Sequence, residues 1–205
     1  MTQSKEDTMY NEAIITRKVR LPYTAVGANL EENLYTMISH LMQGKCSEEG
    51  YIQVGTMKIL TYSVGLQIAN DIEFDVVIKC YVCCPVNGMI LSCEVKNKTL
   101  AGIRAEYTFD QELKQQVSII KKSIENTNTE KQIDKIEKNI IEKMGRKENY
   151  NSPIVVYLAS DQHNQGTVGN KLEKIKVGES ITVEVIGQRF ELNDDHVNII
   201  GKLIN

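Results

Sequence analysis

The clearest pattern in the chain is an alternation over residues 72–79, where Ile72, Phe74 and Val76 are separated by charged residues, and the apolar run continues without a break to residue 84. A period of two places these side chains on one face of an extended chain, so the pattern predicts a long strand with one buried face. Pro85 follows directly. Because proline lacks a backbone N–H and fixes its own φ, a central strand cannot continue through it unbent. We therefore predict one long strand that leaves a first folded unit and bends at Pro85 into a second.

The chain before this strand combines strand and helix patterns. Strands are predicted at residues 13–21, 50–54 and 57–62. Apolar residues such as Leu34 and Ile38 recur at helical spacing between the first two strands, which predicts a helix over residues 30–43. Together these elements predict a small α+β domain over residues 14–84, preceded by a flexible polar N-terminus over residues 1–13.

After Pro85, five short runs have the patterns expected of strands, and one of them, residues 154–158, is a continuous apolar run that predicts a buried strand. They lie at residues 89–95, 102–107, 154–158, 180–187 and 196–204, with a turn-rich segment at 96–99. Five short strands of this kind suit a five-stranded OB-type β-barrel, which we predict over residues 85–205. Residues 111–147 instead have apolar positions at spacings of three and four, so we predict a helical hairpin inserted between barrel strands. The predicted fold class is α+β.

Composition favours an intracellular globular protein. The 205 residues are enough for one large or two small domains, and no apolar run approaches the ~20 residues that a membrane span needs. Five cysteines, an odd number, fit reduced thiols better than a disulfide framework. The net charge of −3 argues against a globally basic nucleic-acid-binding protein.

Four cysteines are candidates for a metal site, and we interpret them as buried apolar side chains. They are Cys80, Cys83, Cys84 and Cys93. The first two fall in a predicted strand, where residues three apart face opposite sides, and no second close pair completes a zinc site. His163 lies near no nucleophile with a local signature, and the sequence has no glycine-rich phosphate loop. The sequence therefore predicts no catalytic residue, no metal ligand and no cofactor.

The predicted barrel offers a possible surface for RNA. OB-type barrels bind single-stranded nucleic acid with aromatic side chains that stack on bases and with cations that contact phosphates. The candidates are Lys96, Lys98, Arg104, Tyr107, Arg189 and Phe190. In the alternative interpretation, Tyr107 and Phe190 belong to the barrel core and the cations form a solvated rim. The barrel has no positive net charge, which favours this alternative and argues against strong RNA affinity.

Several short motifs, in their order along the chain, resemble one protein family. They are Gly44-Lys45-Cys46, Gly50-Tyr51-Ile52, Phe74-Asp75-Val76, Gly88-Met89-Ile90 and Gly102-Ile103, and in the tail Lys176–Glu179 and Ile199-Ile200-Gly201. They resemble the stalk subunit of multisubunit DNA-dependent RNA polymerases, a family that comprises the seventh subunit of eukaryotic polymerase II and its archaeal counterpart. The sequences of residues 93–106 and 186–194 are most similar to versions of this subunit carried by large DNA viruses of eukaryotes. The resemblance covers residues 14–108 and 153–204.

The resemblance implies a non-catalytic polymerase subunit with an N-terminal tip domain and a C-terminal OB domain. The tip domain would dock on the largest polymerase subunits near the clamp, through loops that contain Tyr23, Val26, Gly27, Leu66, Ile68 and Asp71. The OB domain would contact nascent single-stranded RNA or initiation factors, and a second stalk subunit is a further implied partner. The hairpin predicted at 111–147 departs from the cellular pattern. A viral protein of this family would act in the host cytoplasm, at the virus factory, and be packaged in the virion; a cellular one would act in the nucleus.

Two other classes of function stay open at this point. A free-standing OB-fold RNA-binding factor in translation or RNA decay would bind RNA in isolation, with a steep salt dependence. An enzyme with an unrecognised site would lose its activity on substitution of Cys93 or His163.

Overall fold

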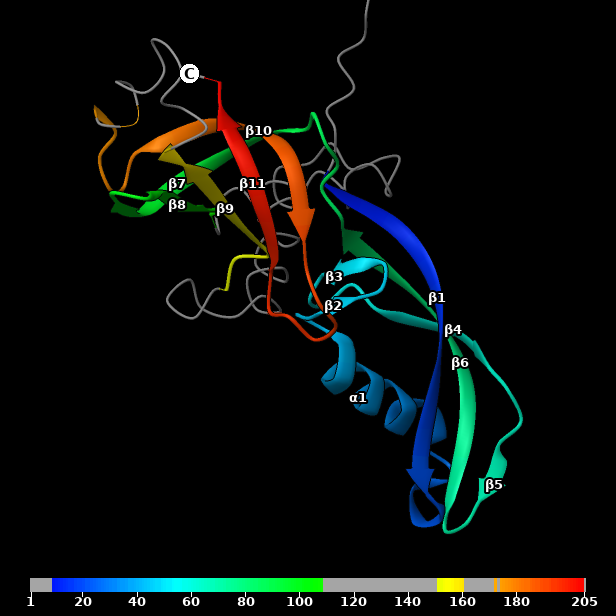
Figure 1. Cartoon of the computed structure of the whole chain (residues 1–205). Coiled ribbons are helices and arrows are strands. Elements are labelled where there is room, and N and C mark those ends of the chain that lie inside the picture. The colour runs from blue at the N-terminus through cyan, green and yellow to red at the C-terminus, as the bar shows by residue number, and fades with distance from the viewer. Residues whose placement is uncertain (1–8, 109–150, 161–171, 173, 205) are drawn as a thin grey trace, which may run out of the picture.

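The computed structural model describes residues 9–108, 151–160, 172 and 174–204. Within these ranges the fold is mixed α+β and mostly β, with a first sheet and a closed five-stranded barrel (Figure 1). The predicted hairpin at 111–147 and the candidate His163 lie outside the described residues.

The first sheet is built around one central strand. Its elements are β1 (Tyr10–Pro22), the 3₁₀ turn η1 (Tyr23–Ala25), α1 (Leu30–Met42), β2 (Cys46–Ser47), β3 (Gly50–Ile52), β4 (Lys58–Tyr62), β5 (Leu66–Ile68) and β6 (Asp71–Cys83). The order is β1-β6-β3-β2, and β4 and β5 also pair with β6. Leu34 and Ile38 of α1 are buried in one cluster with Phe74, Val76 and Ile78 of β6. The predicted helix therefore covers the face of the sheet that the alternation indicated.

Two local predictions about this first part of the chain are wrong. The first strand begins at Tyr10, three residues before the predicted start at residue 13. Met9 and Tyr10 are buried, so the predicted flexible N-terminus over residues 1–13 does not extend through residues 9–13. The sequence pattern did not predict a strand at these residues, because Asn11 and Glu12 are exposed and polar. The segment with Leu66 and Ile68, which we expected to be a loop, contains the short strand β5.

The barrel has the five strands that the sequence predicts. They are β7 (Ile90–Thr99), β8 (Gly102–Glu106), β9 (Ile154–Ala159), β10 (Ser180–Arg189) and β11 (Val197–Leu203). The barrel closes in the order β10-β11-β9-β8-β7, with β10 also paired to β7. All pairs are antiparallel except β9 with β11. This arrangement is compatible with an OB-type barrel. The segment 96–99, predicted as a turn, continues β7 instead.

The sheet and the barrel have separate apolar cores that meet on β6. Phe74, Val76 and Cys80 face the core of the sheet, whereas Cys83 lies in the core of the barrel. The barrel core also includes Met9, Tyr10, Cys46 and Tyr51 from the near end of the sheet. It therefore crosses the domain boundary that we placed after residue 84.

A second joint lies at the turn between β10 and β11. The backbone N–H of Cys46 donates to the carbonyl of Asp194 at 2.7 Å, and the N–H of Asn193 donates to the carbonyl of Cys46 at 2.9 Å. Asn193 has a positive φ of 68°, which asparagine tolerates better than most residues. The turn thus adds backbone hydrogen bonds to the apolar contact between barrel and sheet (Figure 1).

Candidate nucleic-acid interface

The outer surface of strands β8 and β9 brings a cation and an aromatic ring together. Arg104 and Tyr157 are directly opposed in the antiparallel pair. Their neighbours Ile103, Val156 and Leu158 are buried in the barrel, so the alternation of a strand turns Arg104 and Tyr157 outward. The side chain of Tyr157 is 42% exposed, and its ring is accessible for stacking on a base.

These two side chains border a shallow hollow of about 340 Å³. It is lined by Asn97, Thr99, Ala101, Gly102, Ile103, Arg104, Tyr157, Leu158 and Ala159. A guanidinium, a phenol ring and the amide of Asn97 supply a cation for phosphate, a stacking surface and a hydrogen-bonding group for a base edge. Among the described residues of the barrel, this hollow therefore combines groups that could hold one nucleotide of a single strand.

Neighbouring carboxylates offset much of the positive charge around the hollow. Arg104 Nη2 lies 2.6 Å from Glu106 Oε1, and Lys96 Nζ lies 2.8 Å from Glu94 Oε1. A paired guanidinium attracts a phosphate less strongly than a free one, because the phosphate competes with the carboxylate. The geometry thus supports weak RNA binding with local contacts, in line with the charge of the sequence.

Among the other predicted RNA-binding residues, the prediction for Tyr107 is wrong. Tyr107 is only 6% exposed and packs in the barrel core, and its backbone N–H donates to Ser152 Oγ at 3.1 Å. A buried ring cannot stack on a base, so the alternative interpretation of this residue is right. Lys98 is half-buried at the end of the barrel, where its Nζ donates to the carbonyl of Ile175 at 3.0 Å.

The two candidates on β10 lie away from the hollow. Arg189 pairs across the strands with Asn198 of β11, so β11 and β9 separate it from Arg104 on β8. Its guanidinium is 3.1 Å from Glu191 in an exposed ion pair. Phe190 is half-buried and packs against the barrel core. The structure therefore does not bring these two residues together with Arg104.

Tyr157 was not among the residues predicted to bind RNA. It lies in an apolar run that we interpreted as a buried strand, and Val155, on the same outer face, is indeed only 2% exposed. The available signal was the register of a barrel strand, since positions 155, 157 and 159 must share the face opposite to 156 and 158.

The proposed docking residues gather at the end of the first sheet that points away from the barrel (Figure 1). The N–H of Tyr23 donates to the carbonyl of Asn70 at 3.4 Å, which holds η1 beside the β5–β6 turn. Tyr23 is 71% exposed and Leu66 is 64% exposed. Val26 packs partly against the core of the sheet, whereas no atom lies within 4 Å of where a Cβ on Gly27 would stand.

The remaining docking candidates lie in the β5–β6 hairpin. Ile68 and Asp71 are directly opposed across the hairpin, and both are half-buried. Val64, just before β5, is 94% exposed. Together with Tyr23 and Leu66, Val64 gives this end of the sheet a group of exposed apolar side chains that its own core does not use.

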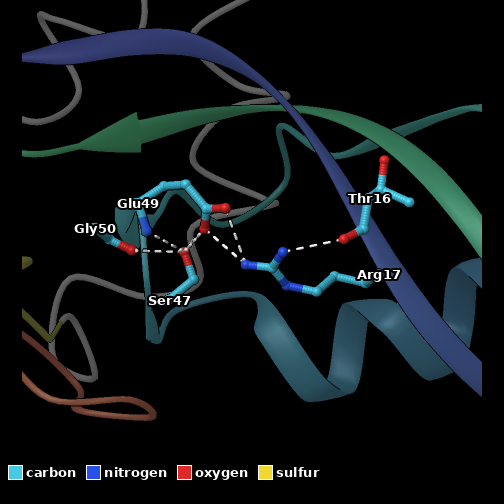
Figure 2. Close-up of polar contacts among 5 residues, drawn as sticks. All are labelled: Thr16, Arg17, Ser47, Glu49 and Gly50. Carbon is cyan, nitrogen blue, oxygen red and sulfur yellow. Dashed lines mark hydrogen bonds and ion pairs between the residues drawn. The ribbon is translucent and has the colours of Figure 1, made fainter.

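A polar network braces the sheet near the barrel (Figure 2). Arg17 Nη2 donates to both carboxylate oxygens of Glu49, at 3.1 and 2.7 Å, and Arg17 Nη1 donates to the carbonyl of Thr16. Ser47 Oγ donates to Glu49 Oε2 at 2.8 Å, and lies 3.2 Å from the carbonyl of Gly50. Partial burial works against ionisation of Glu49, but the hydrogen bonds from Ser47 and Arg17 outweigh it and lower the pKa of the carboxyl.

The cysteines behave as apolar side chains. The predicted burial is confirmed for Cys80, Cys83 and Cys93, whereas Cys84 is half-buried. Cys80 and Cys83 face different cores, as their spacing in a strand predicts. Burial raises the pKa of the Cys93 thiol to about 12 and that of Cys80 to about 11, so both are held as neutral thiols. Within the described ranges, no three His, Cys, Asp or Glu side chains come together to hold a metal ion.

The part of the chain that the structure describes contains no helix that could cross a membrane. No protein-family model matches the sequence, and no curated protein matches it either.

Proposed function

We propose that this chain is a non-catalytic stalk subunit of a DNA-dependent RNA polymerase. In this proposal the first sheet with α1 is the tip domain, which docks on the largest polymerase subunits, and the barrel is an OB domain that contacts nascent RNA. The predicted hairpin at 111–147 is an insertion that takes over contacts of a second stalk subunit. For a viral member of the family, the site of action would be the host cytoplasm.

The exposed apolar end of the sheet is the observation that carries this proposal. Tyr23, Val64 and Leu66 leave large apolar surface in water, at the position where the family resemblance expects the docking loops. A group of exposed apolar side chains at one end of a molecule is typical of a protein–protein contact. The opposite end of the molecule carries the barrel, so docking through the sheet would leave the hollow beside Arg104 and Tyr157 accessible to RNA (Figure 1).

The test is co-purification from the native source with a tagged chain. We expect the wild-type protein to bring down the large polymerase subunits, and the double variant Tyr23→Ser, Leu66→Ser to lose them. Ile186→Ser is the matched control, because Ile186 is also an exposed apolar residue, at 45%, but lies on the barrel. Absence of polymerase subunits from the wild-type sample would refute the proposal.

A free-standing RNA-binding factor is the second candidate, favoured by the pairing of Arg104 with Tyr157. The two proposals differ in what they require of the isolated protein. A free-standing factor would bind single-stranded RNA alone and would associate with RNA rather than with polymerase in the cell. A stalk subunit requires only weak RNA affinity, since the polymerase holds the transcript nearby and raises its local concentration.

A further inference from the structure

The end of the barrel farthest from the first sheet exposes two aliphatic side chains. Leu100, at the tip of the β7–β8 turn, is fully exposed at 101%, and Val177, in the turn before β10, is 63% exposed. The two turns lie side by side at this end of the molecule (Figure 1). We call this surface, formed by residues 96–101 and 174–179, the outer end. It is remote from the docking residues Tyr23 and Leu66.

Hydrogen bonds hold the outer end in place. The N–H of Gly178 donates to the carbonyl of Val95 at 2.8 Å, and the N–H of Val95 donates to the carbonyl of Glu179 at 2.9 Å. Lys98 Nζ reaches across to the carbonyl of Ile175. On the other side of the tip, Ser160 Oγ donates to the carbonyl of Leu100 at 3.0 Å. Leu100 and Val177 are therefore presented on braced turns, which lowers the entropy cost of binding through them.

The outer end also carries four lysines. Lys96, Lys174 and Lys176 are exposed, and Lys98 is half-buried. Lys96 is paired with Glu94, but in the described part of the chain no ion pair joins Lys174 or Lys176 to a carboxylate. Glu179 Oε2 instead accepts the backbone N–H of Lys176 at 3.0 Å. The outer end is thus locally positive on a protein whose net charge is −3.

From this combination we infer that the outer end docks an acidic peptide segment of a partner protein, one that carries two large apolar side chains among aspartates and glutamates. Positive charge selects the acidic residues, and Leu100 and Val177 contact the apolar ones. A single nucleic-acid strand fits less well, because bases need a flat π-face to stack on and both exposed side chains are aliphatic.

The spacing of the contacts defines the peptide further. Val177 lies near Val95 and Lys96 in the second half of β7, since the N–H of the adjacent Gly178 donates to the carbonyl of Val95. Leu100 is four residues farther along than Lys96, which corresponds to about 13 Å of extended chain. Two apolar side chains four positions apart in an extended peptide have the same separation. The inference goes beyond the polymerase proposal and does not depend on it, because it concerns the opposite end of the molecule.

The experiment measures fluorescence anisotropy of a labelled 12-residue peptide, with two leucines four positions apart among aspartates and glutamates, titrated with the full chain. We expect saturable binding that weakens as salt is raised. The variant Lys174→Glu, Lys176→Glu should weaken it about tenfold, because two attractions become repulsions. Leu100→Ser, Val177→Ser should weaken it to a similar extent, and so should a peptide with serines in place of the leucines. The matched control is Lys58→Glu, Leu60→Ser, which makes the same kinds of change at exposed residues of β4 in the first sheet and should bind as the wild type does.

Three results would overturn the inference. The first is that the wild type does not bind the peptide. The second is that the control weakens binding as much as the outer-end variants, which would indicate a general charge effect. The third is that a 12-nucleotide single-stranded RNA displaces the peptide and depends on Lys174 and Lys176 but not on Leu100, which would make the surface a nucleic-acid contact. None of these results bears on co-purification with polymerase, so the two proposals fail separately.

Discussion

Gly102 is the residue on which the candidate RNA site depends most directly. It begins β8, lines the hollow, and has a positive φ of 152°. A Cβ at this position would overlap the carbonyl oxygen of Leu158 and lie 3.2 Å from the Cα of Ala159. All the atoms in the way belong to the backbone of β9, so no side-chain rotation can relieve the overlap. Substitution of Gly102 by alanine must therefore push β8 and β9 apart.

Two contributions add to give the expected loss of stability in Gly102→Ala. A non-glycine residue at such a φ costs about 1–3 kcal/mol of backbone strain. Forcing an extra methyl group into closely packed surroundings costs about 1–3 kcal/mol more. We therefore expect Gly102→Ala to lower the free energy of unfolding by about 2–6 kcal/mol, a large fraction of the ~5–15 kcal/mol that is typical of a folded domain.

Gly88 supplies the matched control. It also has a positive φ, of 83°, but nothing lies within 4 Å of where its Cβ would stand. Gly88→Ala should therefore cost only the strain, about 1–2 kcal/mol. The assay is urea unfolding of the full chain, monitored by circular dichroism. If Gly102→Ala proves no more destabilising than Gly88→Ala, then β8 and β9 do not approach as closely as described, and the geometry of the hollow is wrong.

Three further outcomes are expected. Because its hydrogen bonds lower the pKa of Glu49, this carboxylate stabilises the fold above its ordinary pKa of 4.5, and the contribution is lost as the pH falls through the lowered value. Between pH 6 and 3, the free energy of unfolding measured in urea should accordingly fall further for the wild type than for Glu49→Gln. The difference should be less than about 1 kcal/mol, because the pair of Glu49 and Arg17 is partly exposed. Glu106→Gln should release Arg104 for phosphate, and thus strengthen single-stranded RNA binding and steepen its log–log salt dependence by about 1; an unchanged slope would mean that Arg104 contacts no phosphate. Iodoacetamide at pH 8 should label the half-buried Cys84 but not Cys93, whose pKa burial raises to about 12, as mass spectrometry of the folded protein would reveal.

Local alternation was sufficient to predict the central strand and the barrel strands. β6 was expected over residues 72–84 and spans Asp71–Cys83, because one of its faces meets the apolar core of the sheet over most of its length. Pro85 marked the end of that strand for a steric reason that needs no tertiary context. The strand β1 was predicted too short, since its first residues, beginning with Tyr10, pack where the sheet meets the barrel.

The aromatic residue of the candidate site could not be chosen from the sequence. Tyr107 and Tyr157 both lie in or beside apolar barrel strands, and only the register of the closed barrel turns one inward and the other outward. Part of the outer face of β9 is itself covered, as the 2% exposure of Val155 indicates, so the strand has the pattern of a uniformly buried one. The apolar pattern of a strand that is buried on both faces therefore does not indicate which single residue, here Tyr157, is exposed.

The contact between the sheet and the barrel could not be predicted from local sequence patterns either. Cys46 and Asp194 are far apart along the chain, and their contact is made through backbone atoms that carry no residue-type signal. Asn193 looks like an ordinary turn residue, and its role in this contact follows only from the tertiary structure.

The position of β11 in the barrel has a consequence for biosynthesis. It lies between β9 and β10, yet it comes after every other strand along the chain. While the ribosome is still making Val197–Leu203, two strand edges stay unpaired, although the whole first sheet has already emerged and can fold. A nascent molecule can thus pass through a stage at which the first sheet is native while the barrel edges are open to aggregation, and this stage lasts until β11 pairs with both of its neighbours.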